Sequence, residues 1–108
     1  MKKFFFAYRG KKISVDVIEC KTFIQKGTGL MFRKDNRALL FPFRRKVNRA
    51  IHSFFCKPFI ALWFNDKRIV DVQLVRPWQF SIRPKKKFNI LLEIPVGNKF
   101  FTQISDEE

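Results

Sequence analysis

Apolar side chains recur at every second position along most of this chain, which is the period of a β-strand with one buried face. Ile13, Val15 and Val17 alternate with polar residues within residues 12–18. A second apolar run, residues 4–8, precedes them after a short connection that contains a glycine. Two such runs joined in this way predict a β-hairpin with one solvated face.

Four further runs predict strands, and they are residues 39–43, 59–64, 68–76 and 88–94. Residues 59–64 are apolar without interruption, as in a strand buried on both faces. Turn-forming residues at 65–67 lead into the next strand, so these two runs predict a second hairpin.

Alternation within the last two strands predicts which side chains share a face. In the strand at 68–76 we expect Val70, Val72 and Leu74 to lie together. In the last strand the residues expected on one face are Phe88, Ile90, Leu92 and Ile94. Residues 44–49 are expected to form a basic loop or a single turn.

One short helix is expected between the first hairpin and the third strand. Thr22 followed by Gln25 is a capping-box pattern, and Gly27 and Gly29 follow where a short helix would end. The sequence therefore predicts a mainly β fold, a small, strongly curved sheet or barrel with one short α-helix. Residues 1–108 are expected to form a single domain, with a frayed acidic tail at residues 105–108.

The net charge is the strongest indication of function. Twenty-three Lys and Arg against nine Asp and Glu give a formal charge of +14, and 17% of the residues are aromatic. Such a charge makes a compact chain repel itself, and solubility alone does not require it. The composition therefore points to a polyanionic partner such as RNA.

Basic clusters are the candidate phosphate contacts. They comprise Arg33, Lys34 and Arg37; Arg44, Arg45, Lys46 and Arg49; and Arg83, Lys85, Lys86 and Lys87. Trp78 and Phe80 precede the last cluster, and an exposed ring there could stack on a base. Rings of this size are more often core residues, so both interpretations stay open.

Groups for catalysis or metal binding are few. The chain has one histidine, His52, and two cysteines, Cys20 and Cys56. We expect a structural or surface His52, a buried Cys56, no metal, no cofactor and no catalytic activity. Two distant cysteines favour a reducing compartment, so the expected localisation is cytoplasmic, and no apolar run is long enough to span a membrane.

Two carboxylates could form a functional pair, or each could be neutralised by a cation. Glu19 and Glu93 stand in apolar or basic surroundings. Because cations are abundant, pairing with Arg33 or another cation is the favoured interpretation.

Several ordered blocks of the chain form a recognisable set. They are Glu19, Thr22, Lys26, Gly29-Leu30-Met31 and Arg33; Leu40-Phe41 and Phe43; Ile51-His52 and Phe54-Phe55; Arg68-Ile69-Val70-Asp71-Val72 before Pro77; and Leu92-Glu93-Ile94-Pro95 with Gly97. In this order the blocks resemble the family called domain of unknown function 192, and specifically its short archaeal-type members. The resemblance implies a compact, mostly β domain with one helix under the sheet. It implies no reaction, and Ala61 stands where such members usually carry an aspartate.

Together these observations predict a basic, non-catalytic domain that binds RNA phosphates, with ribosomal RNA or the ribosome as the expected partner. Recognition would follow backbone and shape, because no sequence-reading motif is present. The alternative is a ligand-binding barrel with a small pocket near Arg33, His52 and Glu93.

Overall fold

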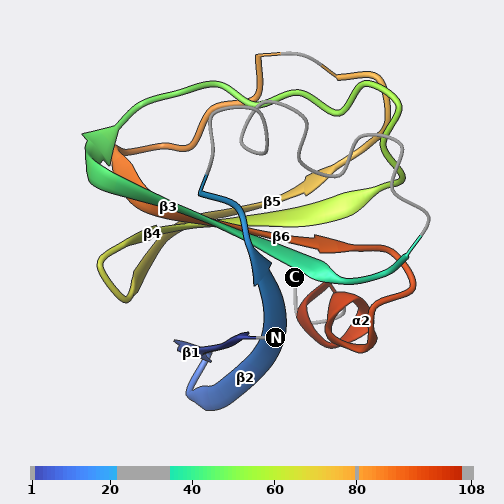
Figure 1. Ribbon diagram of the computed structural model, residues 1–108, viewed down its shortest axis with the longest axis horizontal. Helices are drawn as coiled ribbons and strands as arrows, with labels where there is room; N and C mark the ends of the chain where they lie inside the picture. Colours follow the sequence, from blue (N-terminus) through green and yellow to red (C-terminus); the bar gives the residue numbers. More distant parts are fainter. Residues whose placement is uncertain (1, 22–34, 80, 106–108) are drawn as a thin grey trace.

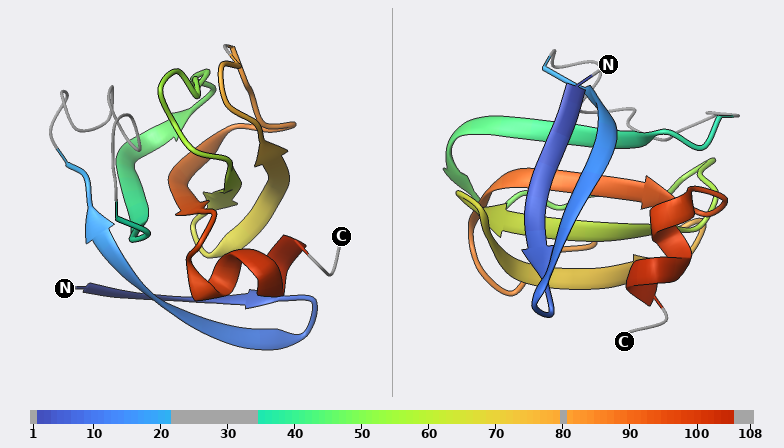
Figure 2. Two further views of the ribbon diagram at one scale, coloured as in Figure 1. Left: turned by 90° about the vertical axis from the view of Figure 1, so that its right-hand side faces the viewer. Right: turned by 90° about the horizontal axis from the view of Figure 1, so that it is seen from below.

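The computed structural model describes residues 2–21, 35–79 and 81–105. Its strands are β1 (Lys2–Tyr8), β2 (Lys11–Glu19), β3 (Ala38–Val47), β4 (Phe59–Asn65), β5 (Arg68–Val75) and β6 (Phe88–Pro95), and its described helix is α2 (Lys99–Ser105). The strands form one sheet in the order β1-β2-β3-β6-β4-β5, which curls into a half-barrel (Figures 1 and 2). The predicted mainly β fold with a strongly curved sheet is confirmed. No helix among the described residues is long and apolar enough to cross a membrane.

Both predicted hairpins are present. Strands β1 and β2 pair antiparallel, with Tyr8 opposite Lys11, so the turn consists of Arg9 and Gly10. Both turn residues have positive φ, 50° and 82°, as in the type I′ turns of two-residue hairpins. Strands β4 and β5 also pair antiparallel, and β4 is buried along nearly its whole length, as its uninterrupted apolar run indicates.

The two faces of the sheet carry separate groups of buried side chains. The hairpin-side core lies between the sheet, the β1–β2 hairpin and α2, and includes Phe4, Phe6, Ile13, Val15, Leu62, Phe64, Leu92, Ile94 and Ile104. The loop-side core lies on the opposite face and includes Cys20, Leu39, Phe41, Cys56, Phe59, Ala61, Trp63, Val75, Phe88 and Leu91. Residues 48–58 and 76–87 connect the strands on this second side (Figure 2).

β-Bulges change the predicted faces of β5 and β6. Trp63 pairs with Asp71 but Phe64 pairs with Ile69, so Val70 is an extra residue in the ladder. Val70 therefore packs on the loop-side core while Val72 packs on the hairpin-side core, and the expectation that they share a face is wrong.

A second irregularity affects β3 and β6. Pro42 pairs with Ile90 and Val47 pairs with Phe88, which leaves four residues of β3, 43–46, opposite the single residue Asn89 of β6. Phe88 consequently packs on the loop-side core, whereas Ile90 packs on the hairpin-side core. Because pairing resumes at Val47, β3 runs through residues 44–46, and the predicted basic loop is partly a strand.

The described helix is not the one expected from the sequence. Residues 22–29, where a helix was predicted, lie outside the described residues. Helix α2 begins after Asn98, whose side-chain oxygen accepts a hydrogen bond from the Phe100 amide at 3.0 Å, as an N-cap residue does. Ile104 is fully buried on the hairpin-side core, and Phe100 packs beside it. The helix reaches Ser105, so the predicted tail at 105–108 begins too early; residues 106–108 are not described.

Candidate nucleic-acid interface

Strand pairing brings two of the three predicted basic clusters together. Val47 lies opposite Phe88, so the end of β3 and the start of β6 are neighbours, at the left of Figure 1. Residues 44–46 immediately precede Val47 and residues 85–87 immediately precede Phe88, so in this antiparallel pair the two clusters extend along the strands in opposite directions from the Val47–Phe88 pair. All six of these cations are exposed, and we call them the basic edge: Arg44, Arg45, Lys46, Lys85, Lys86 and Lys87.

A buried carboxylate holds one half of the basic edge in place. Asp71 is 7% exposed, and its Oδ2 accepts hydrogen bonds from the Lys85 amide at 3.0 Å and from Gln73 Nε2 at 3.0 Å. Gln73 Nε2 also donates to the Arg83 carbonyl at 2.9 Å. The Arg83 guanidinium in turn donates to the Asn48 carbonyl at 2.7 Å, which joins the two connections behind the edge. These contacts fix the backbone from which the lysines project.

A recess of about 270 Å³ opens beside the basic edge and is lined by Lys21, Pro42, Phe43 and Arg44. Phe43 is half-buried and packs edge-on against Phe88, with ring centroids 5.5 Å apart. Two cations and an aromatic ring in one lining suit a phosphate group with an attached planar group. Sequence reasoning missed this recess because Lys21 and residues 42–44 are far apart in the chain.

The remaining predicted contacts are distributed differently. Arg49 is exposed two residues beyond the end of β3. Arg37 is exposed at the opposite end of that strand, about 20 Å from the basic edge at the usual rise per residue, and does not belong to it. Arg33, Lys34 and Phe80 lie outside the described residues.

Trp78 is 60% exposed, so the core interpretation of this residue is wrong. Its ring lies 4.7 Å from that of Phe55, which is itself 50% exposed. Phe54 lies 6.0 Å from Trp78 and stacks on His52 at 5.1 Å. Sequence reasoning missed Phe54 and Phe55 as partners of Trp78, because only tertiary contacts join residues 54–55 to residue 78.

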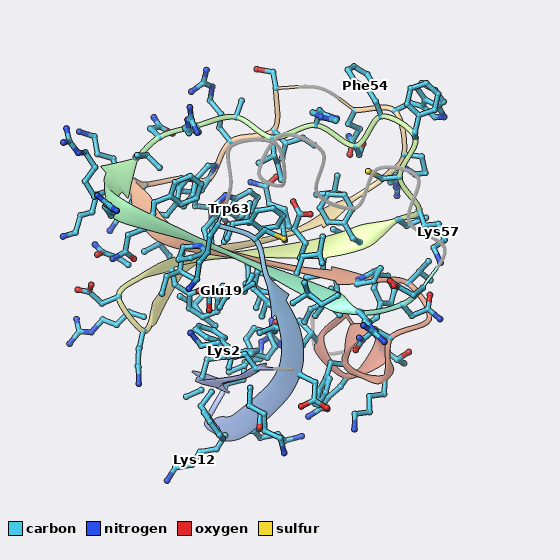
Figure 3. The ribbon with its side chains drawn as sticks, viewed as in Figure 1. Lys2, Lys12, Glu19, Phe54, Lys57 and Trp63 are labelled. Atoms are coloured by element: carbon cyan, nitrogen blue, oxygen red, sulfur yellow. The ribbon has the colours of Figure 1, made fainter. Side chains whose placement is uncertain are left out.

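Glu93 and Trp63 carry polar groups that are buried in the loop-side core. Glu93 lies opposite Leu39 and Ala61, so it faces this core, and burial raises its pKa to about 8. Among the described residues none forms a salt bridge with Glu93, and the predicted partner Arg33 lies outside them. Trp63 is fully buried, and its indole N–H has no hydrogen-bond partner within the described part of the chain (Figure 3).

Glu19 does pair with cations. Its carboxylate forms salt bridges with Lys2 and Lys21, and its hydrogen bonds with these two lysines hold its pKa below the usual value (Figure 3). Glu19 lies opposite Leu40 of the hairpin-side core, whereas Glu93 lies opposite Leu39 of the loop-side core, so the two carboxylates are on opposite faces and do not form a pair.

His52 and Cys56 have structural contacts. His52 Nδ1 accepts a hydrogen bond from the Phe54 amide at 3.2 Å. Cys56 is a free, buried thiol that donates to the Phe54 carbonyl, and burial, with a smaller contribution from Glu93, raises its pKa to about 11. A thiol with so high a pKa is a poor nucleophile at neutral pH, which agrees with the predicted structural role.

Comparison with known proteins places the chain in a family. The model of DUF192, described as uncharacterized ACR, matches residues 5–106. A UPF0127 protein of Pyrococcus furiosus is 33% identical over 93 residues, covering 82% of this chain and 79% of the relative. A second UPF0127 protein, of Pyrococcus horikoshii, is 39% identical over 82 residues, covering 72% of this chain and 70% of the relative.

The fold is also shared with a solved structure. A protein of unknown function from Novosphingobium aromaticivorans superposes with a TM-score of 0.77 at 15% identity, covering 88% of this chain and 73% of that one. None of these names carries a catalytic function. The match along nearly the whole chain agrees with the ordered sequence blocks, and this protein belongs to the DUF192 family.

Proposed function

We propose that this protein is a non-catalytic RNA-binding domain whose basic edge contacts the phosphate backbone. The observation that carries the proposal is the pairing of Val47 with Phe88, which joins two clusters separated by about forty residues into one exposed surface. Arg49 and Arg83 extend that surface along the adjoining connections.

Holding the like charges of the basic edge close together costs free energy. Six exposed cations at the ends of two paired strands repel one another, and within the described residues no acidic side chain forms a salt bridge with any of them. An RNA backbone relieves this repulsion and releases its condensed counterions on binding. A ribosomal RNA or another structured RNA presents such a backbone in a fixed shape.

The proposal is tested by the salt dependence of binding to a fluorescent RNA, followed by anisotropy. If about six phosphates are neutralised, the slope of log K against log salt is about −4 to −5. Replacing Arg44, Arg45 and Lys46 with alanine should weaken binding to unrelated RNAs by similar factors. It should also make the slope of log K against log salt less negative by about 2 to 3. A slope near zero for the unmodified protein would exclude phosphate binding.

A matched control separates the basic edge from net charge in general. Lys3, Lys12 and Lys99 are exposed on the hairpin and α2, and replacing all three with alanine removes the same charge as the edge variant. We expect this control to keep most of the affinity and the salt slope. Equal weakening in both triple variants would show a diffuse charge effect instead of an interface.

A second candidate function is the binding of a small carbonyl compound in the loop-side core. It is favoured by the unpartnered Trp63 N–H and by the Glu93 carboxyl, which is protonated at neutral pH when its pKa is about 8. Both groups are donors that suit a carbonyl oxygen. A carbonyl ligand should then raise the melting temperature of the protein and fail to raise that of the Glu93→Gln variant if the carboxyl O–H is required.

A further inference from the structure

Two connections on the loop side run next to each other and end in an aromatic cluster. Ile51 forms an antiparallel bridge with Ile82, with reciprocal backbone hydrogen bonds of 2.9 Å. Further along, the Ser53 amide donates to the Gln79 carbonyl at 2.8 Å, and the Trp78 amide donates to the Ser53 carbonyl at 3.1 Å. The two connections are therefore joined at several points between the basic edge and Trp78, and we call this paired region the track.

The end of this track presents aromatic faces to solvent. Trp78 is 60% exposed and Phe55 is 50% exposed, and their centroids are 4.7 Å apart with an interplanar angle of 65°. Phe54 and His52 continue the cluster behind them. Figure 3 shows Phe54 on the outer connection, well away from the buried Trp63.

The backbone holds these rings in an unfavourable conformation. Phe55 has φ of 58° and Trp78 has φ of 65°, values that bulky side chains rarely adopt. Ser53, which is fully buried, supports this geometry: its hydroxyl donates to the Arg76 carbonyl and accepts from the Gln79 amide at 2.8 Å. Exposed rings on a strained, hydrogen-bonded support are typical of a binding surface.

Exposed cations lie close to the aromatic cluster in the chain. Arg76 is two residues before Trp78, and Arg83 lies further along the track toward the basic edge. Lys57, two residues after Phe55, donates a hydrogen bond to Asn36 Oδ1 at 2.9 Å. Aromatic faces next to cations suit a base whose phosphate is bound beside it, whereas an apolar peptide would offer Arg76 no acceptor.

We propose that Trp78 and Phe55 form a stacking platform for an unpaired base of single-stranded RNA. This inference rests on the proposed binding of RNA phosphates, and adds that the RNA leaves the basic edge as a single strand and follows the track to the rings. The preferred substrate is then an RNA with a single-stranded segment of about four or more nucleotides next to the bound backbone.

The test compares two probes with equal phosphate content, an oligouridylate of about ten nucleotides and an abasic RNA of the same length. We expect the protein to bind the oligouridylate about tenfold to a hundredfold more tightly. The variant Trp78→Ala should lose this preference and keep its affinity for the abasic strand. Trp78→Phe should restore part of the preference, because a smaller ring still stacks.

The matched control is Phe5→Ala, which removes a ring of similar exposure, 61%, from the β1–β2 hairpin. It should leave both affinities unchanged. Circular dichroism verifies that each variant is folded. Phe55→Ala removes the other ring of the platform and should also reduce the preference for oligouridylate over abasic RNA.

The outcomes separate the inference from the function on which it rests. Equal, salt-dependent binding of both probes overturns the stacking platform and leaves phosphate binding intact. No binding of either probe also overturns the stacking platform, and the salt titration with structured RNA then decides phosphate binding separately. The third outcome combines equal affinity for the two RNA probes with binding to phosphatidylserine vesicles that is lost in Trp78→Ala. That result assigns the rings to a lipid surface and overturns the inference.

Discussion

The two cores of the half-barrel differ in how they are closed. Regular structure covers the hairpin-side core: the β1–β2 hairpin and α2 pack apolar residues such as Phe4, Phe6 and Ile104 against the sheet. The loop-side core is bordered by irregular connections and includes both cysteines. The buried acids Asp71 and Glu93 also face this side, since they pair with its members Trp63 and Ala61.

The hairpin-side core mainly contributes stability, whereas the loop side carries the groups proposed for binding. Apolar packing between regular elements contributes stability without offering a group to a ligand. Polar groups buried under irregular connections cost stability unless they are paired, and they are retained where they position other groups. Asp71 fits this pattern, since it fixes the backbone at Lys85, and Ser53 does the same for Trp78. Both proposals place binding on the loop side.

The largest effect on stability is expected in the hairpin-side core. Phe64 is fully buried and makes edge-to-face contacts with Phe4 and Phe6 at 5.2 and 5.4 Å. Phe64→Ala should lower the free energy of unfolding by about 3–5 kcal/mol in denaturant titration. RNA affinity of the folded fraction should not change. A loss of affinity larger than the unfolded fraction explains would break the separation of the two sides.

Glu93 should give a pH dependence that is characteristic of the loop side. In the unfolded chain its pKa is near 4.5, and in the folded chain it is about 8. Between these values the folded state binds the extra proton, so the contribution of Glu93 to stability is complete below about pH 4.5 and is lost as the pH rises toward 8. Relative to Glu93→Gln, the unmodified protein should lose about 3 kcal/mol between pH 4 and pH 7. Parallel stability curves for the two proteins would contradict a buried, protonated Glu93.

Ser53 should couple a moderate loss of stability to a loss of base stacking. Ser53→Ala leaves the Arg76 carbonyl and the Gln79 amide without their hydroxyl partner, which should cost about 1–3 kcal/mol. The preference for oligouridylate over abasic RNA should fall, because Trp78 is then less well held. Unchanged base preference in a measurably destabilised variant would show that the aromatic cluster does not depend on Ser53.

The smallest effect is expected at Glu19, and it has the opposite sign with pH. Lys2 and Lys21 lower the pKa of Glu19, so its contribution is present above the unfolded pKa near 4.5 and is lost as the pH falls. Because the two lysine side chains are largely exposed, Glu19→Gln should cost no more than about 1 kcal/mol at neutral pH and less in high salt. Comparing the two glutamine variants across pH tests whether the two carboxyls differ in this way.

Prediction from the sequence succeeded where the physical signal was local. The alternation at Ile13, Val15 and Val17 identified the first hairpin and its buried face, and the apolar run at 59–64 identified β4. Prediction failed at the bulges, where one extra residue moves Val70 to the other face. It also missed α2, whose single N-cap at Asn98 and short length give a weak signal that only the packing of Ile104 completes.

The sequence by itself determined the charge, the strands and the two exposed basic clusters, because composition and periodicity act over a few neighbouring residues. Only the tertiary structure decided that Val47 meets Phe88, that Arg37 lies apart, and that Phe55 and Trp78 share one surface. Register and bulges set these distances, and they depend on the packing of the whole sheet. The candidate interface is therefore a property of the fold, assembled from segments whose chemistry was already visible in the chain.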